Sequence, residues 1–170
     1  MSTLATMLVS TDILPEREPN ERFHHLQELV DVLPDQEELA QRLARSVAAQ
    51  RVMECERTLS SCETAFIKAE EAVASARTAS IRAREAGDET AAQAQEQTML
   101  FHSEQLGLKL GPVEEARAAL QQALTDGDFA DVIQAEEAVL SPEEEIAIAA
   151  QIATYRGDYA ATLAACEAEA

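Results

Sequence analysis

The sequence has no tryptophan and few other aromatic residues. Four Phe and two Tyr are the only aromatic side chains among its 170 residues. Any hydrophobic core must therefore consist of Ala, Leu, Val and Ile, and alanine favours helices at little entropic cost while it buries little area. Such a composition favours close helix–helix contacts over a bulky centre. We expect an all-α fold.

Basic side chains are also scarce. Thirteen Lys and Arg stand against 32 Asp and Glu, which gives a formal net charge of −19. Proteins that bind the nucleic-acid backbone or an anionic membrane need clustered Lys and Arg, so we expect neither partner. No run approaches the roughly 18 apolar residues of a membrane span, and the N-terminal MSTLATMLVS lacks a basic flank. The expected location is cytoplasmic.

The three cysteines, Cys55, Cys62 and Cys166, are too few for a dense disulfide framework and form no CxxC pair. Cys55 and Cys62 are one heptad apart, or about 10.5 Å along a helix, which is beyond the reach of a disulfide. We expect reduced thiols, with these two acting as small buried apolar residues.

The chain does contain a heptad pattern between residues 48 and 83. Small or apolar residues recur there at alternating steps of four and three, which is typical of a long helix packed along its length against another helix. Neither Gly nor Pro interrupts residues 36–86, so the helix can run unbroken. The interaction seam that we predict consists of Val52, Cys55, Leu59, Cys62, Phe66, Ala69, Val73 and Ala76.

A helical hairpin is expected to follow from Gly87-Asp88, which supplies a helix stop and then a new cap. The partner helix is predicted at about 89–109 and would cover only the last 20 or so residues of the long helix. Residues 35–64 would then need another cover, either the short helix expected at 21–33 or a second chain. We therefore expect self-association or a place in a larger assembly.

Beyond residue 110, helix stops and starts recur at intervals of 15 or 16 residues, at Gly111-Pro112, Gly127-Asp128, Ser141-Pro142 and Gly157-Asp158. This punctuation predicts four short helices, over 112–125, 128–140, 142–156 and 158–169. The expected organisation is an N-terminal arm and short helix (1–34), a coiled-coil hairpin (35–110) and an acidic module of short helical hairpins (111–170).

Within that module Gly127-Asp-Phe-Ala and Gly157-Asp-Tyr-Ala repeat at a spacing of 30. The pattern resembles the start of the second helix of a tetratricopeptide hairpin, over fewer than 60 residues and without that repeat's period of 34 or its large first-helix residues. The resemblance implies two stacked helical hairpins. The face expected to dock a partner consists of Phe129, Ile133, Tyr159 and Leu163.

Few residues are candidates for metal binding or catalysis. His24, His25 and Glu28 include one i, i+4 pair of possible ligands, but zinc normally needs three or four protein ligands and His102 is far away in sequence. Carboxylates are too abundant for any pair to stand out as a general acid and base. We expect no catalytic residue, metal or cofactor.

The sequence therefore predicts a non-enzymatic helical interaction protein, an adaptor or structural component of a larger assembly of bacterial or phage type. The alternative is an acidic chaperone, or a nucleic-acid mimic, that binds a basic partner, because residues 112–170 carry thirteen acids against Arg117 and Arg156. Salt would weaken only the charge-driven complex.

Overall fold

The computed structural model describes residues 19–168, and all regular structure within this range is helical. The helices are α1 (Pro19–Asp31), α2 (Leu33–Glu85), α3 (Glu89–Asp126), α4 (Val132–Ala138) and α5 (Pro142–Glu167). The predicted all-α class and long helical hairpin are confirmed, whereas the predicted arm before residue 19 lies outside the described residues. Two compact units are present. The hairpin unit is Gln41–Glu145, and the terminal unit joins the described residues up to Ala40 with those from Ile146 onward.

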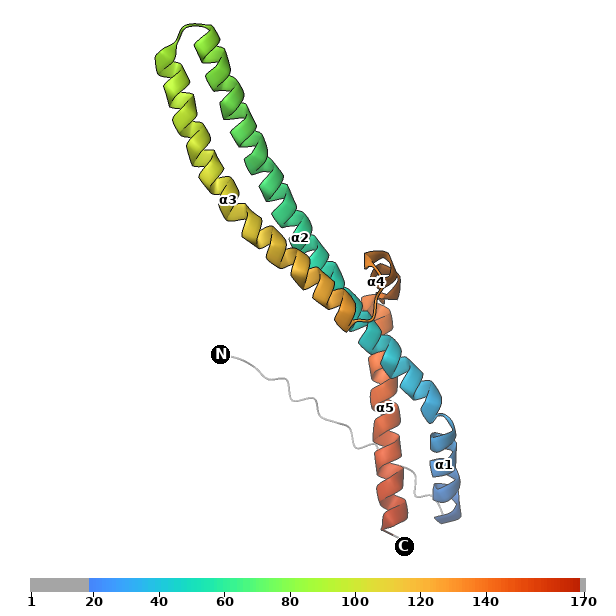
Figure 1. The fold of residues 1–170 in the computed structure, drawn as a ribbon. Coiled ribbons are helices and arrows are strands. Elements are labelled where there is room, and N and C mark those ends of the chain that lie inside the picture. The colour runs from blue at the N-terminus through green and yellow to red at the C-terminus, as the bar shows by residue number, and fades with distance from the viewer. Residues whose placement is uncertain (1–18, 169–170) are drawn as a thin grey trace. The chain divides into compact units, whose positions relative to one another are not determined.

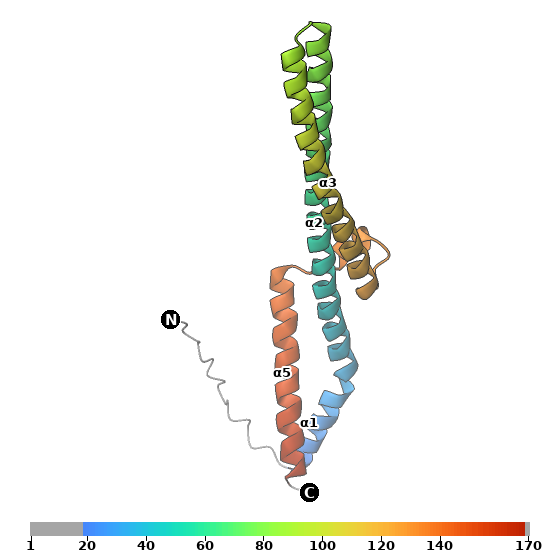
Figure 2. The same ribbon diagram turned by 60° about the vertical axis from the view of Figure 1, so that its left-hand side comes forward.

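In the hairpin unit α2 and α3 run side by side and antiparallel from a tight turn (Figures 1 and 2). Gly87 has a φ of +76°, a conformation that suits glycine because it has no Cβ. Asp88 caps α3 by accepting a hydrogen bond from the Ala91 amide at 2.9 Å. The turn therefore lies at the predicted position, and it is formed as predicted by a glycine that ends α2 and an aspartate that caps α3.

All eight residues of the interaction seam are buried or half-buried, with Val52 fully buried and Ala76 nearly so. Val52 belongs to a buried cluster that includes Ala123 and Leu124 of α3. The heptad pattern of α2 thus faces its own chain over this part of its length.

Helix α3 is longer than predicted, and the expected stop at Gly111-Pro112 is wrong. One helix replaces the separate helices expected at 89–109 and 112–125, and Pro112 lies inside it. A proline in a helix interior costs about 3 kcal/mol, but Val113, Ala116, Ala123 and Leu124 are buried, and their packing offsets that cost. Because α3 reaches Asp126, its Ala123 and Leu124 pack against Ala49 and Val52 of α2. The gap expected over residues 35–64 of α2 is therefore closed in its later part.

Beyond α3 the chain folds back onto the α2–α3 pair. Phe129 is buried there, with the Arg45 guanidinium carbon 4.8 Å from the centre of its ring. The helix predicted at 128–140 is shorter than expected, because α4 begins only after Asp131, which caps it by accepting from the Gln134 amide at 2.8 Å. The core of the unit consists of Ala49, Val52, Ala123, Leu124, Phe129 and Ala135.

Helix α5 is continuous, so the break predicted at Gly157-Asp158 and the helices expected at 142–156 and 158–169 are wrong. Its start is as predicted, because Ser141 and Glu144 exchange hydrogen bonds of 3.0 and 3.2 Å in a capping box. Farther along, α5 lies beside α1 and the first turns of α2 (Figures 1 and 2), with Ile148 and Ile152 buried. This packing stabilises α5 enough that the helix continues past Gly157. The stacked hairpins implied by the tetratricopeptide resemblance are therefore not formed.

Candidate functional site

Of the three residues considered as metal ligands, only His25 makes a polar contact between helices among the described residues. His25 Nε2 lies 3.0 Å from Asp158 Oδ2, and His25 Nδ1 lies 3.5 Å from Glu28 Oε2. His24 is exposed. No three metal-ligating side chains gather anywhere in the described part of the chain. His25 therefore links α1 to α5 within the terminal unit.

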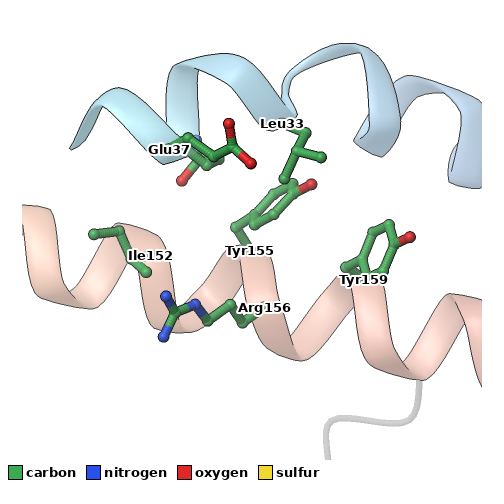
Figure 3. Close-up of a pocket in the computed structure, with 7 residues that line it drawn as sticks. Leu33, Glu37, Ile152, Tyr155, Arg156 and Tyr159 are labelled. Carbon is green, nitrogen blue, oxygen red and sulfur yellow. The ribbon is translucent and has the colours of Figure 1, made fainter. Parts of the chain in front are cut away.

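The terminal unit holds a pocket of about 340 Å³ between α2 and α5 (Figure 3). The rings of Tyr155 and Tyr159 stack there, with centroids 6.1 Å apart and planes 28° from parallel. The Tyr155 hydroxyl donates to the Leu29 carbonyl at 2.9 Å, so it ties α5 to α1. The pocket is lined by Leu33, Gln36, Glu37, Ile152, Tyr155, Arg156 and Tyr159.

Two of these lining residues show what this pocket can do chemically. Burial raises the pKa of the Tyr155 phenol, and the charges of Tyr159 and Glu37 raise it further. The phenol is therefore neutral at physiological pH, and its proton is engaged by a backbone carbonyl. Gln36 Oε1 is buried without a hydrogen-bond partner. The pocket thus presents an apolar wall and one buried acceptor without a partner, beside the charged Glu37 and Arg156. No ion pair joins an acid and a base among the described residues that line it.

The hairpin unit carries a different feature, a set of large apolar side chains left in solvent. Phe101 and Leu108 are 56% and 68% exposed, and because they are seven residues apart they share one face of α3. Ile67 and Ile81, two heptads apart, likewise share one face of α2. We call the six exposed members between residues 67 and 110 the hairpin apolar surface: Ile67, Ile81, Leu100, Phe101, Leu108 and Leu110.

A groove of about 350 Å³ opens between α2 and α3 within this unit. Its apolar lining combines the half-buried Phe66 with the exposed Ile67 and Leu110, and it adds the buried Val113. Charged residues complete the lining, and all but one of them are acidic: Glu63, Glu70, Glu114 and Arg117.

The charges around this groove are only partly neutralised. Arg117 donates to Glu63 across the two helices at 3.0 Å. Within the described residues, Glu70 and Glu114 form no ion pair. The groove is thus an apolar hollow with an excess of negative charge at its edge.

The four residues predicted to form one face of the C-terminal module are divided between the two units. Phe129 is buried in the core of the hairpin unit, and Ile133 is 67% exposed on α4. Tyr159 and Leu163 are half-buried on the part of α5 that belongs to the terminal unit. The spacing of 30 that suggested a common face reflects two different local structures.

Sequence reasoning missed the hairpin apolar surface, although a signal for it exists. Ile67 directly follows the seam residue Phe66. Ile81 follows Ser80, which continues the heptad spacing beyond Ala76. A large apolar residue next to a heptad position, in addition to the one at that position, is the signal that marks both. In α3 the neighbours Leu100 and Phe101 cannot both face α2, because successive helical residues point about 100° apart.

Comparison of the chain with protein-family models, curated proteins and solved structures finds no match. Within the described residues, no helix combines the length and the apolar character needed to span a bilayer. Function is therefore inferred from the surfaces of the two units.

Proposed function

We propose that this protein is a non-enzymatic interaction protein that holds another protein through its α2–α3 hairpin, as an adaptor or structural component of a larger assembly of bacterial or phage type. One observation supports this above others: the hairpin leaves six large apolar side chains in solvent within residues 67–110. Apolar residues scattered singly are normal on a surface. Here Phe101 and Leu108 share one face of α3, and Ile67 and Leu110 line one groove. Apolar residues grouped in this way are typical of an interaction site.

Several side chains that could act as acids or bases instead make contacts between helices, which favours a binding function over catalysis. His25 pairs with Asp158, and the Tyr155 hydroxyl is bound by a backbone carbonyl. In the hairpin unit, Glu145 accepts hydrogen bonds of 2.7 Å from both Ser46 and Gln50. Side chains that could act as acids or bases thus hold helices together, which supports a scaffold.

A charge-driven alternative keeps a specific observation in its favour. The acids of residues 112–170 greatly outnumber Arg117 and Arg156, and such an excess suits an acidic chaperone or a nucleic-acid mimic with a basic partner. Salt separates the two functions. Binding through apolar contacts should persist at 1 M salt, where the Debye length is only about 3 Å, and binding through charge alone should not.

The proposal is tested by affinity capture from the organism that makes this protein, with wild-type chain and a double variant, Phe101→Asp with Leu108→Asp. Ile133→Asp is the matched control, because Ile133 is as exposed as Leu108 but lies on α4. We expect a protein retained by the wild type and the control and lost from the double variant, at low and at high salt. Circular dichroism and thermal melting verify that each variant is folded.

Two outcomes would count against the proposal. A partner that binds the double variant as well as the wild type would place the interaction elsewhere on the chain. A partner released by salt from every form alike would favour the acidic alternative.

A further inference from the structure

We propose that the groove between α2 and α3 receives an amphipathic helix of a different protein, whose apolar side chains enter the groove and whose flanking residues are Lys or Arg. The inference rests on the proposed function and specifies the chemistry of the partner. It starts from the four apolar residues that line the groove, Phe66, Ile67, Leu110 and Val113.

These four residues come from two paired helices, so a third helix that lies along the groove would contact both. A hollow of about 350 Å³ has room for a large apolar side chain and part of its neighbours. An amphipathic helix that lays its apolar face into a hydrophobic groove is a common mode of recognition. The groove continues the hairpin apolar surface, since Ile67 and Leu110 belong to both.

The charges at the edge of the groove specify what flanks the apolar face of the partner. Glu70 and Glu114 are exposed and have no ion pair among the described residues, whereas Glu63 is paired with Arg117. An exposed ion pair adds only about 0.2–1 kcal/mol, so affinity comes from the apolar contacts. Complementary charge mainly selects the partner and suppresses wrong ones. Lys or Arg beside the inserted side chain fits this edge, and Asp or Glu does not.

The same charges disfavour a second copy of this chain as the occupant. Each copy carries a formal net charge of −19, so two copies repel one another overall. The α2–α3 segment from residue 60 to 113 is itself acidic, with eight Asp and Glu against five Lys and Arg. An acidic edge would then face another acidic surface. We therefore assign the groove to a partner with basic flanks.

The test uses a displayed library of amphipathic helices with an apolar face and flanking positions that vary among Lys, Ser and Glu. Helices are selected on the wild type and on three variants: Leu110→Asp, the double variant Glu70→Lys with Glu114→Lys, and the control Ile133→Asp. On the wild type we expect Lys at the flanks to be enriched about tenfold over Glu, the selectivity that two exposed ion pairs can provide.

The variants make the expectation specific. Leu110→Asp should abolish selection, because it places a charge in the apolar hollow. The double charge reversal should change the preference from Lys to Glu, and Ile133→Asp should behave as the wild type. Circular dichroism of each variant separates loss of binding from loss of fold, and the charge-reversal variant remains informative because both glutamates are exposed.

Several results would overturn the inference. Failure to enrich any helix on the wild type, equal enrichment of Lys and Glu, or the same preference after charge reversal would each do so. Sedimentation that shows a dimer lost in Leu110→Asp would make a second copy the occupant. If capture from the organism depends on Phe101 and Leu108 but not on these groove substitutions, the proposed function stands and this inference fails. If capture depends on none of these substitutions, the proposed function itself fails.

Discussion

Replacing Gly157 by alanine is expected to stabilise the protein. Gly157 lies inside the continuous helix α5, is exposed, and has open space around the position of an added Cβ. Glycine in a helix interior is less favourable than alanine by roughly 0.8–1 kcal/mol, because it loses more backbone freedom on folding. The substitution removes this cost without a clash. The free energy of unfolding should rise by about 0.5–1 kcal/mol.

The same substitution at Gly87 provides a control of opposite sign. Gly87 has a φ of +76°, a conformation that costs a residue with a Cβ about 1–2 kcal/mol. Urea unfolding followed by circular dichroism measures both changes, read as shifts of the midpoint at constant slope. A destabilising Gly157→Ala would refute the reasoning, because it would mean that α5 is broken at this glycine.

Three further substitutions test the packing and the caps. Phe129→Ala should lower the free energy of unfolding by about 3–5 kcal/mol, because Phe129 is buried in the core. Phe101→Ala should change it by less than about 0.5 kcal/mol, because Phe101 is exposed. If chemical denaturation gave similar values for the two substitutions, this placement of the two rings would be contradicted. Ser46→Ala should cost about 1–3 kcal/mol, since the buried Leu140 amide donates to the Ser46 hydroxyl at 3.0 Å, and a neutral result would show that water replaces this bond. Hydrogen bonds with the backbone and side chain of Ser141 hold the pKa of Glu144 below its ordinary value near 4.5, so the stability that Glu144 contributes is present above that pH and is lost as the pH falls. Glu144→Gln should therefore flatten the pH dependence of the melting temperature below about pH 4.5. An unchanged profile would contradict the cap.

Elements fixed by local chemistry could be predicted from the sequence. The turn at Gly87-Asp88 needs one left-handed residue and one cap, and both are visible as residue types. The capping box at Ser141 and Glu144 is local in the same way. The heptad seam of α2 is a pattern over many residues of one helix, and its members are indeed buried or half-buried.

Helix ends that depend on tertiary packing could not be predicted in this way. Pro112 and Gly157 both disfavour a helix by local rules, yet both lie inside one. Burial of Val113 and Ala116 in α3, and of Ile148 and Ile152 in α5, stabilises these helices enough to offset the cost of the proline and the glycine. That burial depends on which helix lies opposite, and the sequence of one helix does not reveal this. The expected division at residues 34 and 110 concerns independent folding and stays a prediction.

The candidate site shows the same limit. Apolar residues of a helix are normally taken as core, so Phe101 and Leu108 become recognisable as surface only when the position of α2 is known. The groove likewise joins Ile67 and Leu110, which are 43 residues apart in sequence. The predicted face of the C-terminal module relied on a spacing of 30, and that spacing did not distinguish a buried Phe129 from an exposed Ile133.

Site-specific photo-crosslinking in the cells that make this protein tests the central claim most directly. A photoreactive residue is placed at Leu108 in one chain and at Ile133 in another, since the two positions are 68% and 67% exposed. Our account predicts a discrete crosslinked product that contains another protein from position 108, and none from position 133. Equal crosslinking at the two positions, or none at position 108, would contradict it.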